Sequence, residues 1–257
     1  MKIAKLIVII SISFLISCSK GAKEPVLVVD KAGMFKKEQQ DLITKKLLSI
    51  KERTTNEVVL YTAKSLDSRS IADYSLEVSR KLGIGEVGLN NGLLILIAPN
   101  EGEIQIQVSV GDEWIIPDSI SFDIVATIVK YLKIKDYTNG VLHGIDLIDK
   151  RLSEYDWKVH DISLKDFDKV EVGQIVSFSY ENKERKSFKY PLPTDKQFQP
   201  DFFMKLNIDE NVVAKLYYTK HMSDVLSGFT SSGKIKVFAR IRSKSPLQLN
   251  LLGTIKM

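Results

Sequence analysis

The sequence predicts an α/β fold, a layered α/β sandwich with a roughly four-stranded sheet, followed by a small all-β domain. Strands and helices alternate between residues 26 and 155, and one strand of that region is apolar on both faces. From about residue 165 the pattern changes to strands without clear helices. The chain of 257 residues is long enough for one large domain or two modest ones.

Four segments of the first part have the pattern of strands. Residues 26–29 end at Asp30, and residues 57–62 are rich in β-branched and aromatic side chains. Residues 93–98 form a continuous apolar run, which is typical of a central strand. In residues 104–110 apolar and polar side chains alternate, so one face is buried and the other meets water. We expect the last two segments to form a hairpin.

Helical spacing fills the intervals between these strands. Apolar side chains recur three or four residues apart in residues 42–50, 120–131 and 141–152. Residues 71–82 form a further predicted helix. It is followed by residues 83–88, which match the dinucleotide pattern G-x-G-x-x-G. That pattern binds phosphate between a strand and a helix, whereas here it follows a helix, so we expect no nucleotide cofactor and interpret the first glycine as a helix C-cap.

The C-terminal part contains five β-rich segments separated by turn residues: 170–180, 202–208, 212–218, 234–241 and 247–255. They predict a β-sandwich or a barrel-like domain over residues 165–257. Residues 182–199 form a predicted loop in which lysines accompany aromatic side chains. We interpret it as a solvated loop rather than a contact for single-stranded nucleic acid.

The N-terminus has the layout of a secretion signal, with lysines before an apolar run at residues 6–16 that is too short to span a bilayer, which needs about 20 residues. It ends in Leu-Ile-Ser-Cys, which resembles the bacterial lipobox. We expect cleavage after residues 1–17, lipid on Cys18, a tether over residues 18–25 and a membrane-anchored lipoprotein outside the cytoplasm. An ordinary secretory signal is the alternative. The net charge of +5 is mild, and no nucleic-acid partner is expected.

Oxygen-bearing side chains lie near the predicted strand ends. Asp30, Asn91, Glu113 and Asp118 are candidate ligands of a hard cation, Ca²⁺ or Mg²⁺. The alternative is that these residues cap helices and close turns. The chain has no G-x-S-x-G elbow, and its three histidines have no metal-ligand spacing, which disfavours serine hydrolases and transition-metal enzymes.

Five short motifs occur in the order and approximate spacing of the TPM domain, at residues 28–33, 82–85, 90–95, 110–111 and 116–118. The sequence resembles that family over about residues 26–155. The resemblance implies an extracytoplasmic, usually membrane-tethered α/β sandwich. Some members are described as acid phosphatases, divalent cations have been linked to the fold, and other members act in assembly.

By position in the family's motifs, Asp30 would be the aspartate of the D-x-A-G turn. Asn91 would lie with Gly92 in the polar turn before the central strand, and Glu113 would be the acidic residue after V-G. The family often has an arginine before the V-G strand, where this chain has Glu103 and Gln105. The absence of this arginine disfavours phosphate chemistry, because a basic side chain could hold a phosphate oxygen.

Two functions remain. The favoured one is a non-enzymatic binding or assembly module for an unidentified envelope protein, with the C-terminal domain assigned to partner recognition. The alternative is a metal-dependent phosphatase acting on phosphomonoesters, in which a cation polarises a phosphoryl oxygen.

Overall fold

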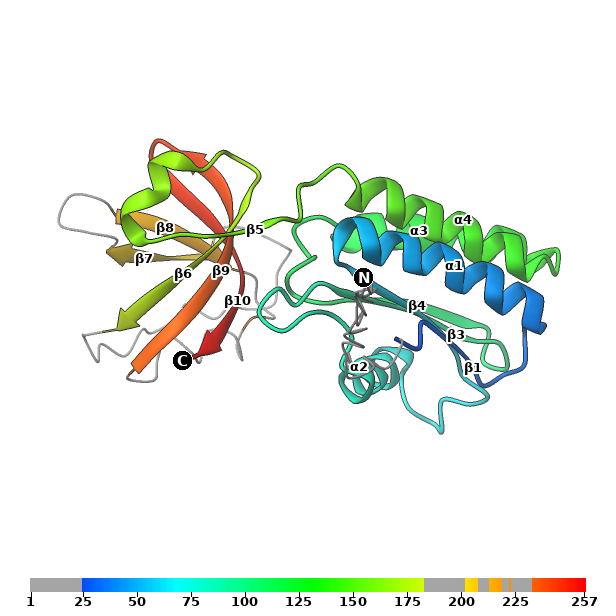
Figure 1. Cartoon of the computed structure of the whole chain (residues 1–257). Helices are drawn as coiled ribbons and strands as arrows, with labels where there is room; N and C mark the ends of the chain where they lie inside the picture. Colours follow the sequence, from blue (N-terminus) through cyan, green and yellow to red (C-terminus); the bar gives the residue numbers. More distant parts are fainter. Residues whose placement is uncertain (1–24, 183–201, 208–212, 219–221, 223–232) are drawn as a thin grey trace, which may run out of the picture.

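The computed structural model describes residues 25–182, 202–207, 213–218, 222 and 233–257. The predicted signal, Cys18 and nearly all of the tether lie outside the described residues, as does most of the predicted loop at 182–199. Among the described residues, no helix combines the length and apolar character needed to cross a membrane. Figure 1 shows an α/β part followed by a β-rich part.

The α/β part is built on the four-stranded sheet that the sequence predicts, and the structure places its strands in the order β1-β2-β3-β4. Its strands are β1 (Val28–Asp30), β2 (Glu57–Thr62), β3 (Gly92–Ala98) and β4 (Glu103–Val108). The first three strands run parallel, and β4 returns antiparallel beside β3 as the predicted hairpin. Every residue of β3 is buried, which explains its continuous apolar run.

Four helices cover the two faces of this sheet. They are α1 (Lys37–Thr54), α2 (Ile71–Leu82), α3 (Asp118–Lys133) and α4 (Tyr137–Leu152). Figure 1 shows α1, α3 and α4 on one face and α2 on the other. The Ser70 side chain caps the start of α2, and Gly83 ends the helix with a φ of 65°, which confirms its interpretation as a C-cap.

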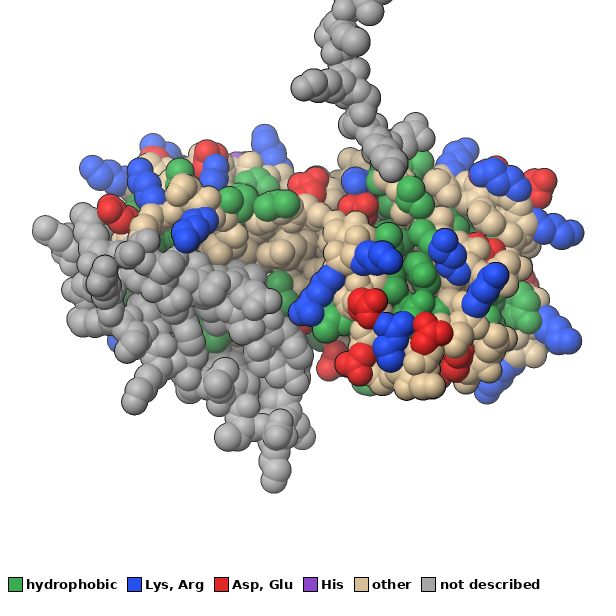
Figure 2. All heavy atoms as spheres, turned by 90° about the horizontal axis from the view of Figure 1, so that it is seen from below, with side chains coloured by type: hydrophobic (Ala, Val, Ile, Leu, Met, Phe, Trp, Pro, Cys, Tyr) green, Lys and Arg blue, Asp and Glu red, His purple; other side chains and the backbone are tan. Residues whose placement is uncertain are grey.

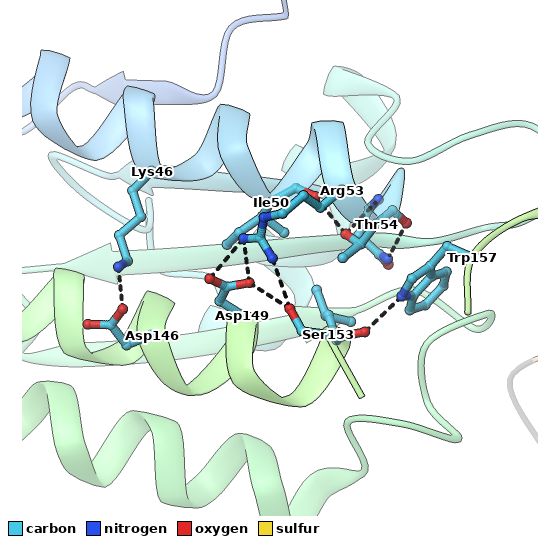
Figure 3. Close-up of polar contacts among 10 residues, drawn as sticks. Lys46, Ile50, Arg53, Thr54, Asp146, Asp149, Ser153 and Trp157 are labelled. Carbon is cyan, nitrogen blue, oxygen red and sulfur yellow. Dashed lines mark hydrogen bonds and ion pairs between the residues drawn. The ribbon is translucent and has the colours of Figure 1, made fainter. Parts of the chain in front are cut away.

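Polar contacts join α1 to α4 along their exposed sides (Figure 3). Arg53 Nη2 lies 2.8 Å from Asp149 Oδ1, and Arg53 Nη1 donates to Ser153 Oγ at 3.0 Å. Lys46 pairs with Asp146 two turns earlier. These contacts fix the relative position of two helices whose apolar faces lie in the core.

The β-rich part forms one sheet in the order β5-β6-β9-β10-β8-β7. Its strands are β5 (Val159–Asp161), β6 (Ile175–Asn182), β7 (Phe202–Asn207), β8 (Val213–Tyr218), β9 (Gly233–Lys244) and β10 (Leu247–Lys256). The two outermost strands, β5 and β7, do not pair with each other among the described residues, so the sheet is open. It has a hydrophobic core of its own.

Two elements of this part differ from the sequence prediction. β5 has only three residues, too few to give an alternating pattern, and it starts the second sheet before residue 165. A short 3₁₀ helix, η1 (Leu164–Lys169), follows it and places Phe167 in the second core.

Candidate functional site: a groove along the free edge of β4

A groove of about 690 Å³ runs along β4, within the size range of ligand sites. We call it the edge groove. One wall is α2, and the other is the segment that leads from β4 into α3. Its lining residues are Ala72, Asp73, Leu76, Ser79, Arg80, Gly83, Ile84, Asn90, Gln105–Val110, Glu113, Ile116, Pro117 and Asp118. Figure 2 views the side that carries α2 and shows charges of both signs around exposed apolar side chains.

The floor of the groove is the outer edge of a strand. β4 ends the sheet order, so only one of its two edges pairs with β3. The Ser109 amide donates to the Gly92 carbonyl at 2.9 Å, which makes this pair hydrogen-bonded. Because bonded residues alternate along an antiparallel strand, Gln105 and Gln107 also face β3 with their backbone groups. The backbone groups of the residues between them point out of the sheet.

Two glutamine side chains cover this outer edge. Gln105 Nε2 donates to the Ile106 carbonyl at 3.3 Å, and Gln107 Nε2 donates to the Val108 carbonyl at 3.4 Å. Both distances are longer than the usual 2.9–3.0 Å for such bonds. The Gln107 Oε1 atom in turn accepts from Ser75 Oγ at 3.3 Å, which connects β4 to α2. The edge is therefore covered by weak, replaceable contacts.

Asp30 closes a turn. Its carboxylate accepts from the Met34 amide at 3.0 Å, from the Phe35 amide at 2.9 Å and from Thr62 Oγ1 at 2.5 Å. These three donors hold the chain as it leaves β1 toward α1. This arrangement is the turn-closing alternative considered for the residue.

Asn91 is a buried residue that fixes the loop before β3. Its Oδ1 accepts from the Glu86 amide at 2.9 Å, and its Nδ2 donates to Thr55 Oγ1 at 3.0 Å. Only 1% of its surface is exposed. Both ends of its amide are therefore satisfied within the protein.

The sheet holds Asp30 and Asn91 at opposite ends of its strands. Asp30 lies opposite Thr62 of β2, which in turn lies opposite Ile97 near the end of β3. Asn91, in contrast, precedes the start of β3. At about 3.3 Å per residue, the two side chains are separated by roughly 20 Å. A single ion cannot contact both, so the structure does not assemble the four predicted ligands.

Glu113 and Asp118 both line the edge groove, and Asn90 lines it as well. Sequence reasoning named Asn91 rather than its neighbour Asn90 as a ligand. The described residues contain no group of three or more His, Cys, Asp or Glu side chains placed to hold a metal. The groove therefore offers the scattered carboxylates of Asp73, Glu113 and Asp118 and several side-chain amides rather than a dense ligand cluster.

The end of the groove adjoins the β-rich part. Asn90 Nδ2 donates to the Leu252 carbonyl of β10 at 3.1 Å. A Cβ on Gly253 would stand 2.2 Å from the Gly88 carbonyl oxygen, and a Cβ on Gly88 would stand 2.6 Å from the Phe238 ring. Backbone here approaches backbone so closely that glycine is required. We call this contact the junction.

A buried acid, Asp112, and a buried base, Arg240, influence each other electrostatically. Burial raises the pKa of Asp112 well above its usual value, and the charge of Arg240 lowers it in part. Burial lowers the pKa of Arg240 to about 10, against the opposing effect of Asp112. Neither carboxylate oxygen of Asp112 has a hydrogen-bond partner within the described part of the chain.

Arg240 is held by contacts of its own. Its Nη1 donates to the Asp156 carbonyl at 2.8 Å and to the Gly173 carbonyl at 2.7 Å, and its guanidinium lies 4.9 Å from the Trp157 ring centroid. Sequence reasoning missed its relation to Asp112, because no pattern in one sequence connects a loop of the first part to a strand of the second.

The fold and groove define an α/β sandwich with an appended β-sheet part. Residues 28–151 match the family model described as the TPM domain. This part of the chain is therefore a TPM domain, and the resemblance seen in its motifs is confirmed. No curated protein matched the chain.

Three solved structures are similar to the first half of the chain. The N-terminal domain of a P. gingivalis protein is 23% identical, with 52% of this chain and 85% of that chain covered and a TM-score of 0.48. The N-terminal domain of the cg2496 protein of Corynebacterium glutamicum is 16% identical, with 52% and 83% covered and a TM-score of 0.41. The BA42 protein of Bizionia argentinensis is 20% identical, with 48% and 86% covered and a TM-score of 0.44.

Proposed function

We propose that this chain is a lipid-anchored binding module of the bacterial cell envelope, and that the edge groove is its docking surface. The main support is an open groove of about 690 Å³ whose floor is a strand edge that, among the described residues, is covered by the side-chain amides of Gln105 and Gln107. Such an edge is a natural template for pairing with another chain.

The anchor supplies the location. The lysines, apolar run and Leu-Ile-Ser-Cys end of the N-terminus support lipid on Cys18, and the polar residues after it support a tether. Replacing Cys18→Ser should move the protein from the membrane fraction to the soluble fraction, while Ser19→Ala should leave it in the membrane. Equal membrane retention of both variants would contradict the anchor.

A divalent cation, Ca²⁺ or Mg²⁺, would bind where Glu113 and Asp118 line the groove, with Asn90 as a neighbouring amide. These cations prefer oxygen ligands, and the remaining positions would be filled by water. Titration with each ion should change the fluorescence of Trp114, which follows Glu113 in the chain. Glu113→Gln should abolish the change, and Asp30→Asn should preserve it, because Asp30 lies at the other edge of the sheet.

One observation favours the alternative of a metal-dependent acid phosphatase acting on phosphomonoesters. Arg80 lines the same groove as Glu113 and Asp118, so a cationic side chain is present although the family's arginine is missing. The test is hydrolysis of p-nitrophenyl phosphate. Metal-dependent turnover that is lost in both Arg80→Met and Glu113→Gln would establish this activity. Turnover that neither substitution affects would come from elsewhere.

The binding role is tested by placing a photo-cross-linking residue in the groove in living cells. Leu76 lines the groove and is 38% exposed, whereas Lys81 is exposed on the same helix outside the groove. The cross-linker at position 76 should give a defined adduct with an envelope protein, and the cross-linker at position 81 should not. The same pattern from both positions would contradict a docking role for the groove.

A further inference from the structure

We infer that the edge groove receives an extended segment of a partner protein, which pairs with β4 as a fifth strand and carries a lysine or arginine. This inference rests on the proposed binding function and specifies its partner. Strand addition is a common way for proteins to bind peptides, with backbone bonds giving affinity and alternating side chains giving specificity.

The backbone of β4 has groups along its outer edge that pair with no strand within the described part of the chain. Ile106 and Val108 direct their backbone N–H and C=O groups out of the sheet, since the residues on either side bond to β3. Within the described residues, no other strand pairs with this edge. An extended segment would find donors and acceptors at the spacing that a β-ladder requires.

The cover on this edge differs from the usual protection of edge strands. Exposed edge strands are usually blocked by lysine, proline or a bulge. Residues 103–110 contain neither lysine nor proline. In the described part of the chain, the carbonyls of Ile106 and Val108 accept from the side-chain amides of Gln105 and Gln107, at 3.3 and 3.4 Å. A partner amide can replace each glutamine amide, which can then turn to water, so no buried group is left unpaired.

The two walls of the groove offer apolar surface to an extended segment. Successive side chains of an extended segment point to opposite faces, so alternate residues would meet α2 and the segment before α3. Ala72 and Leu76 offer apolar surface on the first wall, and Ile116 and Pro117 offer it on the second. Apolar side chains of the partner would be buried on both sides.

The excess of acidic side chains on the groove walls favours a partner with basic side chains. Asp73, Glu113 and Asp118 line the groove, with Arg80 as the one basic side chain among its described lining residues. Asp118 is exposed at the start of α3. Acids outnumber bases, so a segment with a lysine or arginine is electrostatically complementary.

The test uses the chain without residues 1–18 and a display library of linear peptides of about nine residues, from which the tightest binder is taken. We expect it to have a basic residue among alternating apolar ones. Ala72→Trp, which fills the groove, should weaken its binding at least about tenfold. Lys81→Trp, on the same helix outside the groove, should leave the binding unchanged.

Backbone methylation then distinguishes strand addition from other docking. Two versions of the selected peptide carry N-methyl groups on alternate residues, one on the odd and one on the even positions. In a strand, only one set of amides faces β4. One version should therefore lose at least about tenfold in affinity while the other keeps it. Equal loss in both versions, or no loss in either, would overturn strand addition.

Failure of this inference is distinguishable from failure of the proposed function. A library without a groove binder overturns the inference, whereas the binding function is decided by the cross-link at position 76. Self-association of the chain that Ala72→Trp abolishes would assign the groove to a second copy and would also overturn the inference. Loss of affinity in Glu113→Gln and Asp118→Asn, reduced by added salt, would support the basic partner.

Discussion

The side-chain amide of Asn90 donates a hydrogen bond of 3.1 Å to the backbone carbonyl of Leu252, across the junction between the TPM domain and the β-rich part. The same residue accepts from the Gly111 amide through its backbone carbonyl at 3.0 Å. Asn90 therefore connects the loop before β3, the loop after β4 and strand β10. Two of the family's motifs lie in these loops, and in this chain they support a second domain.

Asn90→Gly should loosen the junction. Asn90 has a φ of 49°, which glycine accepts readily, so this substitution mainly removes the bond to Leu252. We expect a loss of about 1 kcal/mol in the free energy of unfolding and faster tryptic cleavage at Lys158, between the two parts. Asn100→Gly is the matched control, since Asn100 Nδ2 bonds to the Lys64 carbonyl within the TPM domain. Equal cleavage in both variants would contradict the role of Asn90.

Gly253→Ala should destabilise the same junction by a different mechanism. The added Cβ would stand 2.2 Å from the Gly88 carbonyl oxygen, a backbone atom that cannot move aside cheaply. We expect a loss of about 1–3 kcal/mol, measured by urea unfolding followed by circular dichroism. Gly102→Ala controls for general effects, because nothing lies within 4 Å of its added Cβ. Wild-type stability of Gly253→Ala would show that the junction is not packed this closely.

The sequence predicted the TPM part well because its helices and strands have strong periodic patterns. The run at 93–98 became the buried strand β3, and the alternation at 104–110 became the half-exposed strand β4. β5 was missed because three residues give no period. The open six-stranded order could not be derived either, since it depends on a parallel pairing of β8 with β10 from distant segments.

The pH dependence of folding should carry a contribution from Asp112. Burial raises the folded-state pKa of Asp112 well above 3.8, so the folded chain keeps a proton that the unfolded chain has lost. The stability from this group is complete below pH 3.8 and declines as the pH rises through the raised pKa. The slope is up to about 1.4 kcal/mol per pH unit.

Asp112→Asn should remove this decline in urea unfolding measured across acidic to neutral pH. Asp161→Asn is the control of opposite sign. Its bonds from Ser177 and Lys236 lower its pKa, so its contribution is present above its usual pKa and is lost as the pH falls. An unchanged pH profile in Asp112→Asn would contradict the burial of an uncompensated carboxyl group.

Arg53→Met should cost about 0.5 kcal/mol, because the ion pair of Arg53 with Asp149 is partly exposed and solvent screens it. Lys37→Met, at an exposed pair within α1, should have almost no effect. The two variants are compared by thermal unfolding at low salt and at about 1 M salt. The difference in stability between them should be smaller at high salt, because salt screens the ion pair. A difference that salt does not reduce would indicate lost packing rather than lost charge.

The candidate site was only partly accessible to sequence reasoning. The sequence predicted Glu113 and Asp118 as ligands because acidic side chains near strand ends can bind a hard cation, and both residues line the groove. The glutamine cover on β4 gave no signal, since Gln105 and Gln107 have the polar spacing of any half-exposed strand. Which edge of a strand remains unpaired depends on the sheet order, and a single sequence does not contain that order.

Amide hydrogen exchange along β4 would detect an added strand residue by residue. It is measured by NMR on the chain lacking residues 1–18, with and without the selected peptide. Exchange at Ile106 and Val108, whose amides point out of the sheet, should slow on binding. Exchange at Gln105 and Gln107, which already face β3, should not change. Protection confined to the Glu113–Asp118 segment, with Ile106 and Val108 unaffected, would contradict the docking of an extended partner on β4.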